Sequence, residues 1–599
     1  MVTKEKLGKA LFVLGAIICI ISAISIFVFL IIKSAPAFIK IGVLDLVFGD
    51  NWSPSVSDNY NNALKGSYGI FTMIIGTIVS TLGALTIGGV LGYFTSIFLV
   101  FYCPKKLKPI AIMIINLLAG IPSVVYGFFG ISFLLPFLSK IAPNNGSGLL
   151  ATSIILGIMI LPTIISLSRV ALESVPRQYY EGSVAIGANH TSTVFKIMVP
   201  SARGGILASL VLGTGRALGE AMAVVMVAGN FPTYPNGLFG SFRTLTANIV
   251  LEMGYAGEVQ EGALIATGVI LLMLVTTINI IFNKISIGTV KAIATTQNSN
   301  KIKTKTESIL RKINFSKIGE IASKIAGITV AIILFMIVSF IFVKGLPTII
   351  NHPWFIFGKF QFGSEEITIL PSLICTVLVA VISLIIATPI GIMTAIYLNE
   401  YAKKEGRLAT IVRGAINILA GVPSIVYGLF GMITFVKIFG GTSSILSGAL
   451  TISIILLPTI VRSTEESLKR VLDSLRQGSL ALGAGKLRTI LKVIIPSALP
   501  GILSAVILSI GRVVSESAPL LYTMGSVIKQ IPSSVFDSGA TLSVALYQLS
   551  GEGWYINEAY ATAVVLIILV FALNLIAELT VKGLSKRLKG DTNEGKSKK

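Results

Sequence analysis

Two arginines lie within apolar stretches that are long enough to cross a lipid bilayer. Arg216 occurs in the run SLVLGTGRALGEAMAVVMVAG, and Glu220 follows it four residues later. Arg512 and Glu516 repeat this pattern in GRVVSESAP, inside another apolar run. A charged side chain at the centre of a bilayer costs about 2.5–3.5 kcal/mol on insertion scales, so such residues usually face the interior of a helix bundle or a water-filled path. These four residues are therefore the first candidates for a functional site.

The chemistry that this pattern allows is anion binding. Residues four apart lie on one helix face, so the spacing predicts that each Arg and its Glu point in the same direction. Two guanidinium groups that meet at a pseudo-two-fold axis would offer forked donors to a tetrahedral oxyanion. The glutamates would weaken the grip, so that the ion can leave again. A second interpretation stays open, in which each pair only neutralises itself and eases insertion of its helix.

Small residues accompany each arginine and predict close helix packing. Gly215 and Gly219 form a GxxxG pair, and Gly511 with Ser515 is its counterpart. Such pairs let two membrane helices approach closely. We therefore expect each helix to pack against a neighbour through its small residues while its arginine faces the path.

The composition indicates a helical membrane protein. The chain has 599 residues, of which 54% are hydrophobic and 12% charged, and its mean hydropathy is +0.87. Soluble domains carry roughly twice that charged fraction. Many runs reach the roughly 20 apolar residues that a spanning helix needs. The net charge of +22 resides largely in short connections between these runs, which is typical of cytoplasmic loops, so no nucleic-acid partner is expected.

Metal, disulfide and nucleotide chemistry is not expected in this chain. Cys19, Cys103 and Cys375 are far apart and form no CxxC, and His190 and His352 are isolated. No disulfide framework or zinc site follows from such spacing. A phosphate-binding GxxxxGK[ST] loop is absent, since GAGKLRT has Leu after its Lys. The sequence thus predicts no catalytic residue, no metal and no cofactor.

The chain consists of two copies of one plan. NLLAGIPSVVYGFFG matches NILAGVPSIVYGLFG, GSVAIGA matches GSLALGA, and LPTI occurs once in each copy. Such self-similarity indicates a duplicated architecture. In this alignment Arg216 and Glu220 correspond to Arg512 and Glu516. The chain is therefore predicted to be a tandem duplication in which both copies run in the same direction.

The apolar runs predict six spans in each copy, about twelve in all. A transmembrane domain is expected at 1–283, a basic cytoplasmic linker at 284–322, a second transmembrane domain at 323–583 and a basic cytoplasmic tail at 584–599. Basic residues near the N-terminus, in the loops YCPKKLKP and YAKKEGR and in the tail predict that both termini are cytoplasmic. The spans are expected near 10–32, 69–101, 110–138, 149–168, 203–229, 261–283, 323–343, 368–398, 411–438, 446–461, 499–526 and 559–581.

A long connection between the fourth and fifth spans of each copy has apolar residues at helical spacing, with charges between them. Its pattern EGSVAIGA…IMVP resembles the EAA motif of permease subunits of bacterial and archaeal ABC importers. The matching residues are Glu181, Gly182, Ser183, Ala185 and Gly187 in the first copy and Gln477, Gly478, Ser479, Ala481 and Gly483 in the second. The resemblance implies two type I (MetI-like) transmembrane domains whose coupling helices dock on ATPase subunits. Gln477 replaces the usual Glu, and the alternative is an amphipathic helix lying on the lipid surface.

The third spans make the resemblance more specific. The motif GxPSxxYGxxG, together with GRxxxExxA in the fifth span, is similar to the phosphate-specific ABC permeases. The first copy resembles the PstC type and the second the PstA type, which are normally separate proteins. The resemblance implies that Arg216, Glu220, Arg512 and Glu516 line the phosphate path. The third-span residues could kink a helix that shapes this path or could serve plain packing; they are Gly120, Pro122, Ser123, Tyr126, Gly421, Pro423, Ser424 and Tyr427.

The resemblance implies the permease subunit of an ATP-driven inorganic phosphate importer in the cell membrane. ATP and Mg would be bound by a separate ATPase of the PstB type, present in two copies, and an external phosphate-binding protein of the PstS type would deliver the ion. Membrane lipid and a phosphate-signalling regulator are the further partners that it suggests. The alternatives are an ABC permease for sulfate or molybdate, an ion-coupled secondary phosphate carrier, and a sensor that transports nothing.

Overall fold

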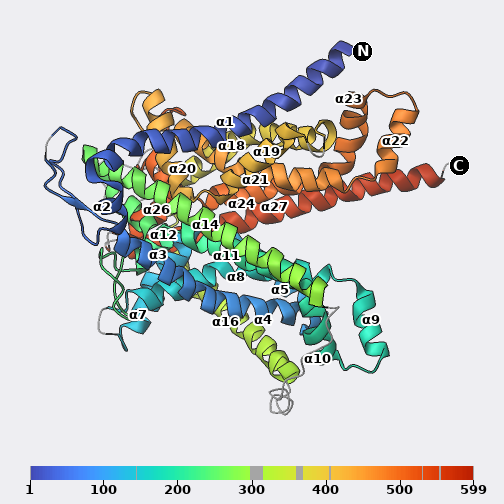
Figure 1. Cartoon of the computed structure of the whole chain (residues 1–599), viewed down its shortest axis with the longest axis horizontal. Coiled ribbons are helices and arrows are strands. Elements are labelled where there is room, and N and C mark those ends of the chain that lie inside the picture. The colour runs from blue at the N-terminus through green and yellow to red at the C-terminus, as the bar shows by residue number, and fades with distance from the viewer. Residues whose placement is uncertain are drawn as a thin grey trace. The chain divides into compact units, whose positions relative to one another are not determined.

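The computed structural model is built almost entirely of helices (Figure 1). It describes residues 2–61, 63–142, 145–296, 315–358, 368–403, 406–528, 531–551, 553 and 555–597. Within these ranges the one sheet is a two-stranded antiparallel hairpin, in which Trp52 pairs with Tyr68 and Ser53 with Ser67. The predicted fold class, a helical membrane protein with a tandem duplication, is confirmed.

The first copy runs from α1 to α14, and several of its spans contain short π-helical segments (η). Its elements are α1 (Val2–Ile41), α2 (Val43–Phe48), β1 (Trp52–Ser53), β2 (Ser67–Tyr68), α3 (Phe71–Ala84), η1 (Leu85–Gly89), α4 (Val90–Ile97), η2 (Phe98–Tyr102), α5 (Lys108–Ala119), α6 (Ser123–Phe129), η3 (Gly130–Leu134), α7 (Leu135–Leu138), α8 (Leu149–Glu173), α9 (Arg177–Ala185), α10 (His190–Thr193), η4 (Val194–Met198), α11 (Val199–Gly219), α12 (Met222–Val227), α13 (Leu245–Glu252), the 3-10 turn η5 (Met253–Tyr255) and α14 (Glu258–Thr296).

The second copy repeats this order. Its elements are α16 (Phe315–Asn351), α17 (Trp354–Phe357), α18 (Leu370–Ile396), η6 (Tyr397–Tyr401), α19 (Arg407–Gly421), α20 (Ser424–Gly431), η7 (Met432–Val436), α21 (Ile445–Lys469), α22 (Asp473–Ala481), α23 (Lys486–Thr489), η8 (Ile490–Ile494), α24 (Ile495–Ser515), α25 (Ala518–Thr523), α26 (Leu542–Gly551) and α27 (Ile556–Ser597).

Ten helices among the described residues are long and apolar enough to cross a membrane, rather than the twelve expected. The difference lies in the third span of each copy, which is broken. In the second copy, α19 and the helix from Ser424 to Val436 meet at an angle of 101° and together could make an eleventh span. In the first copy, the segment from Ser123 to Leu138 is a shorter apolar helix that follows α5.

The fifth spans end earlier in the sequence than expected. α11 ends at Gly219 and α24 ends at Ser515, where the next residue, Glu220 or Glu516, has an extended backbone with ψ of 132° or 134°. A new short helix, α12 or α25, then begins. The expectation that Arg and Glu share one continuous helix is therefore wrong, because each glutamate sits at the break that follows its helix.

The chain divides into two compact units that do not coincide with the two sequence copies. One unit contains residues 1–40, 261–269 and 344–599, and the other contains 41–260 and 270–343. Thus α1 packs with the second copy, where Phe29 contacts Phe430 edge to face and Cys19 lies 3.4 Å from Thr394 Oγ1. In the same way the first part of α16 packs with the first copy, where the Phe340 ring meets Phe129.

Two helices extend beyond the predicted spans. α14 continues to Thr296 and α27 to Ser597, so both run into segments that were expected to be linker and tail. Residues 297–314 of the expected linker lie outside the described residues.

Candidate functional site

Each intramembrane arginine is held by a threonine of the fourth span. Arg216 Nη1 on α11 donates a hydrogen bond to Thr163 Oγ1 on α8 at 3.1 Å. Arg512 Nη1 on α24 makes the same bond to Thr459 Oγ1 on α21, also at 3.1 Å. Both threonines belong to the LPTI sequence of their copy. A donor on a charged group strengthens such a bond, so the threonines restrict where the guanidinium groups can lie.

Each glutamate lies at the break that follows its helix, and groups near the break donate hydrogen bonds to it. Glu220 Oε1 accepts a hydrogen bond from the backbone N–H of Ala223 at 3.2 Å, and the Glu220 carbonyl accepts one from Thr246 Oγ1 at 2.7 Å. The Glu516 carbonyl accepts the corresponding bond from Ser543 Oγ at 2.8 Å. Because lipid offers no partner for a freed backbone group, these hydroxyls stabilise the interruption of the helix.

The distance between the charges in the second copy is short enough for an ion pair. Arg512 Nε lies 3.6 Å from Glu516 Oε1, and 39% of the Arg512 side chain is exposed. In the first copy, Ser123 of the third span hydrogen-bonds the carboxyl group of Glu220. The Arg512 side chain thus keeps accessible surface within a stretch of apolar sequence.

The third span breaks at the proline of its GxPS motif. Pro122 and Pro423 precede α6 and α20 in extended conformation, with ψ of 144° and 145°. A buried tyrosine hydroxyl then reaches back across the break: Tyr126 Oη donates to the Leu118 carbonyl at 2.9 Å, and Tyr427 Oη to the Leu419 carbonyl at 2.5 Å. The break is therefore built into both copies and tied by the same bond.

The glycine after each tyrosine allows the two breaks of one copy to pack together. A Cβ added to Gly127 would lie 2.6 Å from Met226 Sδ and 2.9 Å from Ala223 Cα on α12. A Cβ on Gly428 would lie 2.9 Å from Pro519 Cα on α25. The third-span motif therefore has both of the structural effects considered above, a helix break and close packing. Gly120 and Gly421 lie at the end of the preceding helix, beside the proline turn.

Two pairs of polar residues escaped the sequence analysis. One is Thr163 and Thr459, for which the repeated LPTI sequence was an available signal. The other pair lies on the sixth spans: an added Cβ on Gly215 would be 3.7 Å from Asn279 Oδ1, and one on Gly511 would be 3.5 Å from Asn574 Oδ1. An amide therefore lies beside the glycine that precedes each arginine, at equivalent places in the two copies.

The coupling segments consist of two short helices that project an apolar tip. α9 and α22 each end just before a glycine with positive φ, 90° at Gly187 and 79° at Gly483. The residue before each glycine is largely exposed, with 85% of Ile186 and 90% of Leu482 accessible. The candidates on these helices are Glu181, Gly182, Ser183 and Ala185 in α9 and Gln477, Gly478, Ser479 and Ala481 in α22.

A serine of each coupling helix ties it to the helix that returns to the membrane. Ser183 Oγ lies 2.9 Å from Thr193 Oγ1, and Ser479 Oγ lies 2.9 Å from Thr489 Oγ1. The glycines at the motif's second position, Gly182 and Gly478, have no atom within 4 Å of an added Cβ. The serine therefore faces inward, while the glycines lie on an open surface.

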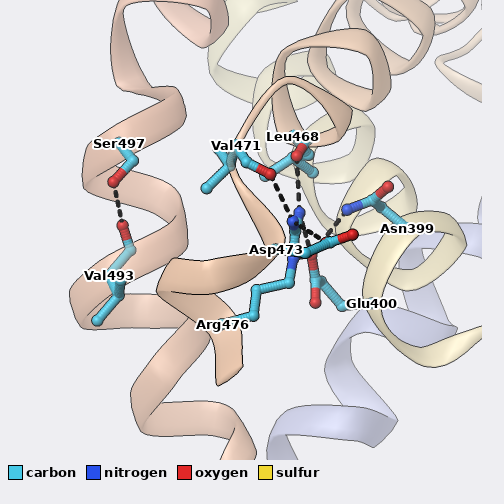
Figure 2. Close-up of polar contacts among 8 residues, drawn as sticks. All are labelled: Asn399, Glu400, Leu468, Val471, Asp473, Arg476, Val493 and Ser497. Atoms are coloured by element: carbon cyan, nitrogen blue, oxygen red, sulfur yellow. Dashed lines mark hydrogen bonds and ion pairs between the residues drawn. The ribbon is translucent and has the colours of Figure 1, made fainter. Parts of the chain in front are cut away.

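The second coupling segment has an additional ionic attachment at its base (Figure 2). Arg476 donates to the carbonyls of Val471 at 2.6 Å and Leu468 at 2.7 Å, and it pairs with Glu400 of η6 at 3.1 Å. Asp473 lies 2.9 Å from the same guanidinium group. Both Arg476 and Glu400 are largely buried, so this contact joins the coupling helix rigidly to the end of the second span.

At the corresponding place in the first copy, a contact between aromatic rings replaces the pair of Arg476 and Glu400. Tyr180 Oη lies 2.8 Å from His190 Nδ1, and the His190 ring meets Tyr102 edge to face. The two coupling segments therefore share their tips and their serine ties, and they differ at the base.

Comparison with known proteins matches two stretches of the chain, 88–288 and 387–590, to one family model, described as "Binding-protein-dependent transport system inner membrane component". Two curated relatives, each called phosphate transport system permease protein PstA homolog, align along most of the chain. The protein from Mycoplasma genitalium is 29% identical over 95% of this chain and 93% of its own length, and that from Mycoplasma pneumoniae 28% identical over 88% and 86%. Phosphate transport system permease protein PstC of Mesorhizobium japonicum is 32% identical over 39% of this chain and 80% of its own length.

Proposed function

The chain belongs to the family of binding-protein-dependent transport system inner membrane components, and on that basis we propose that it is the permease subunit of an ATP-driven inorganic phosphate importer. The permease family supports the transport role, and the names of the Mycoplasma and Mesorhizobium relatives support phosphate as the substrate. Two family matches in one chain support a fusion of a PstC-type and a PstA-type half.

The observation that carries the proposal is the arginine that recurs in each copy with the same threonine partner. Arg216 with Thr163 and Arg512 with Thr459 form two equivalent half-sites, each beside a break in the third and fifth spans. Each guanidinium group would offer forked donors to a phosphate ion in the path. Glu220 and Glu516 would limit its dwell time, because conduction requires that the ion also leave.

ATP hydrolysis would take place on separate subunits. We expect two copies of a PstB-type ATPase, which bind ATP and Mg, to receive the tips at Ile186 and Leu482 in surface grooves. An external PstS-type protein would deliver phosphate to the opposite side. Closure of the ATPases would switch the path from inward-facing to outward-facing, and release of ADP and phosphate would reset it. This chain makes and breaks no covalent bond in that cycle.

Membrane orientation follows from the same assignment. ATPases are cytoplasmic, so the coupling helices α9 and α22 would face the cytoplasm together with the basic N-terminus and tail of the chain. The basic loops before α5 and α19 agree with this orientation, since cytoplasmic loops are enriched in Lys and Arg.

Reconstitution tests the proposal directly. The chain is incorporated into liposomes with its ATPase and binding protein, and uptake of radiolabelled phosphate is followed with and without ATP. We expect uptake that requires ATP and that unlabelled sulfate and molybdate do not compete away. Uptake driven by a proton gradient without the ATPase would instead identify a secondary carrier, and competition by sulfate or molybdate would identify a different oxyanion.

A further inference from the structure

A cavity lined by cations lies at one end of the unit that contains the second copy. It has a volume of about 350 Å³ and opens between α1, the end of η6 and the beginning of α19. Lys9, Lys403 and Arg407 line it together with the rings of Tyr397 and Tyr401. No aspartate or glutamate among the described residues lines it. Three exposed basic residues therefore border a space that is large enough for a small anionic group.

Uncharged donors add to these cations. α19 begins at Arg407 and runs for 15 residues, and Leu408 and Ala409 of its first turn line the cavity. The first N–H groups of a helix lack partners within the helix and favour a negative charge. The hydroxyl of Tyr401 has no hydrogen-bond partner among the described residues, but it is buried and does not face the cavity. Two kinds of donor, cationic side chains and helix N–H groups, thus border one cavity.

Glu5 and Glu400 lie near the cavity, since both act electrostatically on Tyr401, but neither lines it. Glu400 is bound by Arg476. Glu5, one turn before Lys9 on α1, lies against Gly485, where an added Cβ would come 2.4 Å from Glu5 Oε1. Lys486 adds a further positive charge, 4.8 Å from the centre of the Tyr401 ring.

The first copy has a lysine beside the corresponding tyrosine, but that lysine is ion-paired. Lys324 of α16 lies 5.7 Å from the centre of the Tyr102 ring, and its ammonium group pairs with Glu320 at 2.7 Å. When KSAP of α1 is aligned with KGLP of α16, Glu320 stands at the position of Lys9 and Lys324 at the position of Val13. No ion pair joins Lys9 to any other described residue, so the carboxylate found in the first copy is replaced by a lysine beside the cavity.

From these contacts we infer that this cavity binds a phosphate group, either the head group of an anionic phospholipid or free orthophosphate. Lysine and arginine donors around a helix N-terminus suit the oxygens of a phosphate. Basic pockets between membrane helices on the cytoplasmic side are the chemistry that recognises anionic head groups. Basic loop residues that only determine the orientation of a span in the membrane do not need to line a cavity. Arg512, which belongs to the same unit, does not line the cavity.

Binding is measured on the full chain in complex with its ATPase. All variants also carry Arg216→Ala and Arg512→Ala, so that the proposed transport path contributes no phosphate binding. One arm places the complex in nanodiscs of phosphatidylcholine with or without phosphatidylglycerol and counts retained phosphatidylglycerol by native mass spectrometry. The other arm measures radiolabelled orthophosphate binding in nanodiscs of phosphatidylcholine alone.

The test variant is Lys9→Gln/Lys403→Gln/Arg407→Gln. Its matched control, Lys105→Gln/Lys106→Gln/Lys317→Gln, removes the same charge from three exposed lysines in the other unit. We expect the test variant to lose retained lipid or bound orthophosphate by on the order of tenfold while the control keeps it. A third variant, Lys9→Arg/Lys403→Arg/Arg407→Lys, preserves the charge and should bind as the parent does.

The arms also identify the source of the phosphate. A loss confined to phosphatidylglycerol assigns the site to lipid, and a loss confined to orthophosphate assigns it to the free ion. Equal binding of both ligands by the test variant and the parent overturns the proposal, as does an equal loss in the control. Assembly with the ATPase, checked by size-exclusion chromatography, ensures that the test variant is folded when it is compared.

Discussion

Arg216 and Thr163 are joined by a hydrogen bond of 3.1 Å between the fifth and fourth spans, and Arg512 and Thr459 repeat that bond at the same length. The same hydrogen bond between arginine and threonine therefore occurs in both copies, on α11 and α8 in the first and on α24 and α21 in the second. It is the clearest structural link between the two copies and the function proposed for them.

Replacing the threonine tests whether it positions the arginine. In Thr163→Val the side chain keeps its shape and loses the acceptor, and we expect phosphate uptake to fall on the order of tenfold, since a bond to a charged group contributes about 1.5–3 kcal/mol. Thr459→Val should behave alike. Uptake is measured in the reconstituted complex. The serine variant at either position restores the hydroxyl and should restore most of the rate; equal loss with serine would show that the hydroxyl is not what matters.

The tyrosine that spans the third-span break should contribute to stability. Tyr126→Phe removes one of two donors to the Leu118 carbonyl, which keeps the Ile121 N–H as a partner, and the net loss of one hydrogen bond costs about 0.5–1.5 kcal/mol. We therefore expect a lower melting temperature in detergent, and the same for Tyr427→Phe. Tyr179→Phe on α9 is the control, because that side chain is 52% exposed, and it should melt as the parent does. An unchanged melting temperature in both variants would contradict the role given to this bond.

The glycine that ends each coupling helix should be needed for ATPase assembly. Gly483 has φ of 79°, a conformation that costs a residue with Cβ about 1–2 kcal/mol. Gly483→Val and Gly187→Val should misplace the exposed tips and weaken co-purification of the ATPase, while the chain still inserts. The control is Gly182→Ala, which lies within α9 and has open space around it. Full ATPase recovery with the valine variants would argue for helices that merely lie on lipid.

A hairpin outside the spans should respond to acid. Asp58 is buried, which raises its pKa, but hydrogen bonds from the backbone N–H groups of Lys65 and Gly66 and from Tyr68 Oη outweigh this and hold the pKa below its usual range. A lowered folded-state pKa stabilises the fold above the unfolded value, about 3.9 for Asp, and this contribution is lost as pH falls through the folded value.

Tryptophan fluorescence can follow that transition, because Trp52 and Tyr68 pack edge to face at 5.9 Å. In a protein whose other tryptophans, Trp354 and Trp554, are replaced by Phe, the signal of Trp52 should be constant at neutral pH and change below about pH 4. With Asp58→Asn added, the signal should resemble the acid form throughout. A pH-independent signal in the Asp58 protein would exclude this carboxylate as the group that titrates.

Much of this architecture could be predicted from repetition in the sequence. The duplicated GxPS and GSxAxGA motifs placed the third-span break and the coupling helices at equivalent positions, because proline and glycine act on the local backbone wherever they occur. Proline excludes the preceding residue from the helical region, and a glycine at positive φ ends a helix. Such effects need no knowledge of tertiary packing.

The break at Glu220 could not be predicted in this way. The run around it is apolar apart from Arg216 and contains no proline, so its local preference is one long helix. The helix ends there because Thr246 and Ser123, distant in sequence, take up the freed carbonyl and the carboxyl group. The packing of α1 with the second copy could not be predicted either, because the sequence of an apolar helix does not specify which helix it packs against. Tertiary contacts decided both features.

Uptake by the arginine variants tests the central claim most directly. Arg216→Ala and Arg512→Ala are each reconstituted with the ATPase and binding protein, and ATP-dependent phosphate uptake is compared with that of the parent. Loss of one guanidinium contact at ~4 Å removes about 4 kcal/mol at an effective dielectric constant of 20, which corresponds to roughly a thousandfold in rate. We predict that each variant loses uptake while it still co-purifies with the ATPase. Normal uptake in both variants would contradict an anion path built on these two side chains.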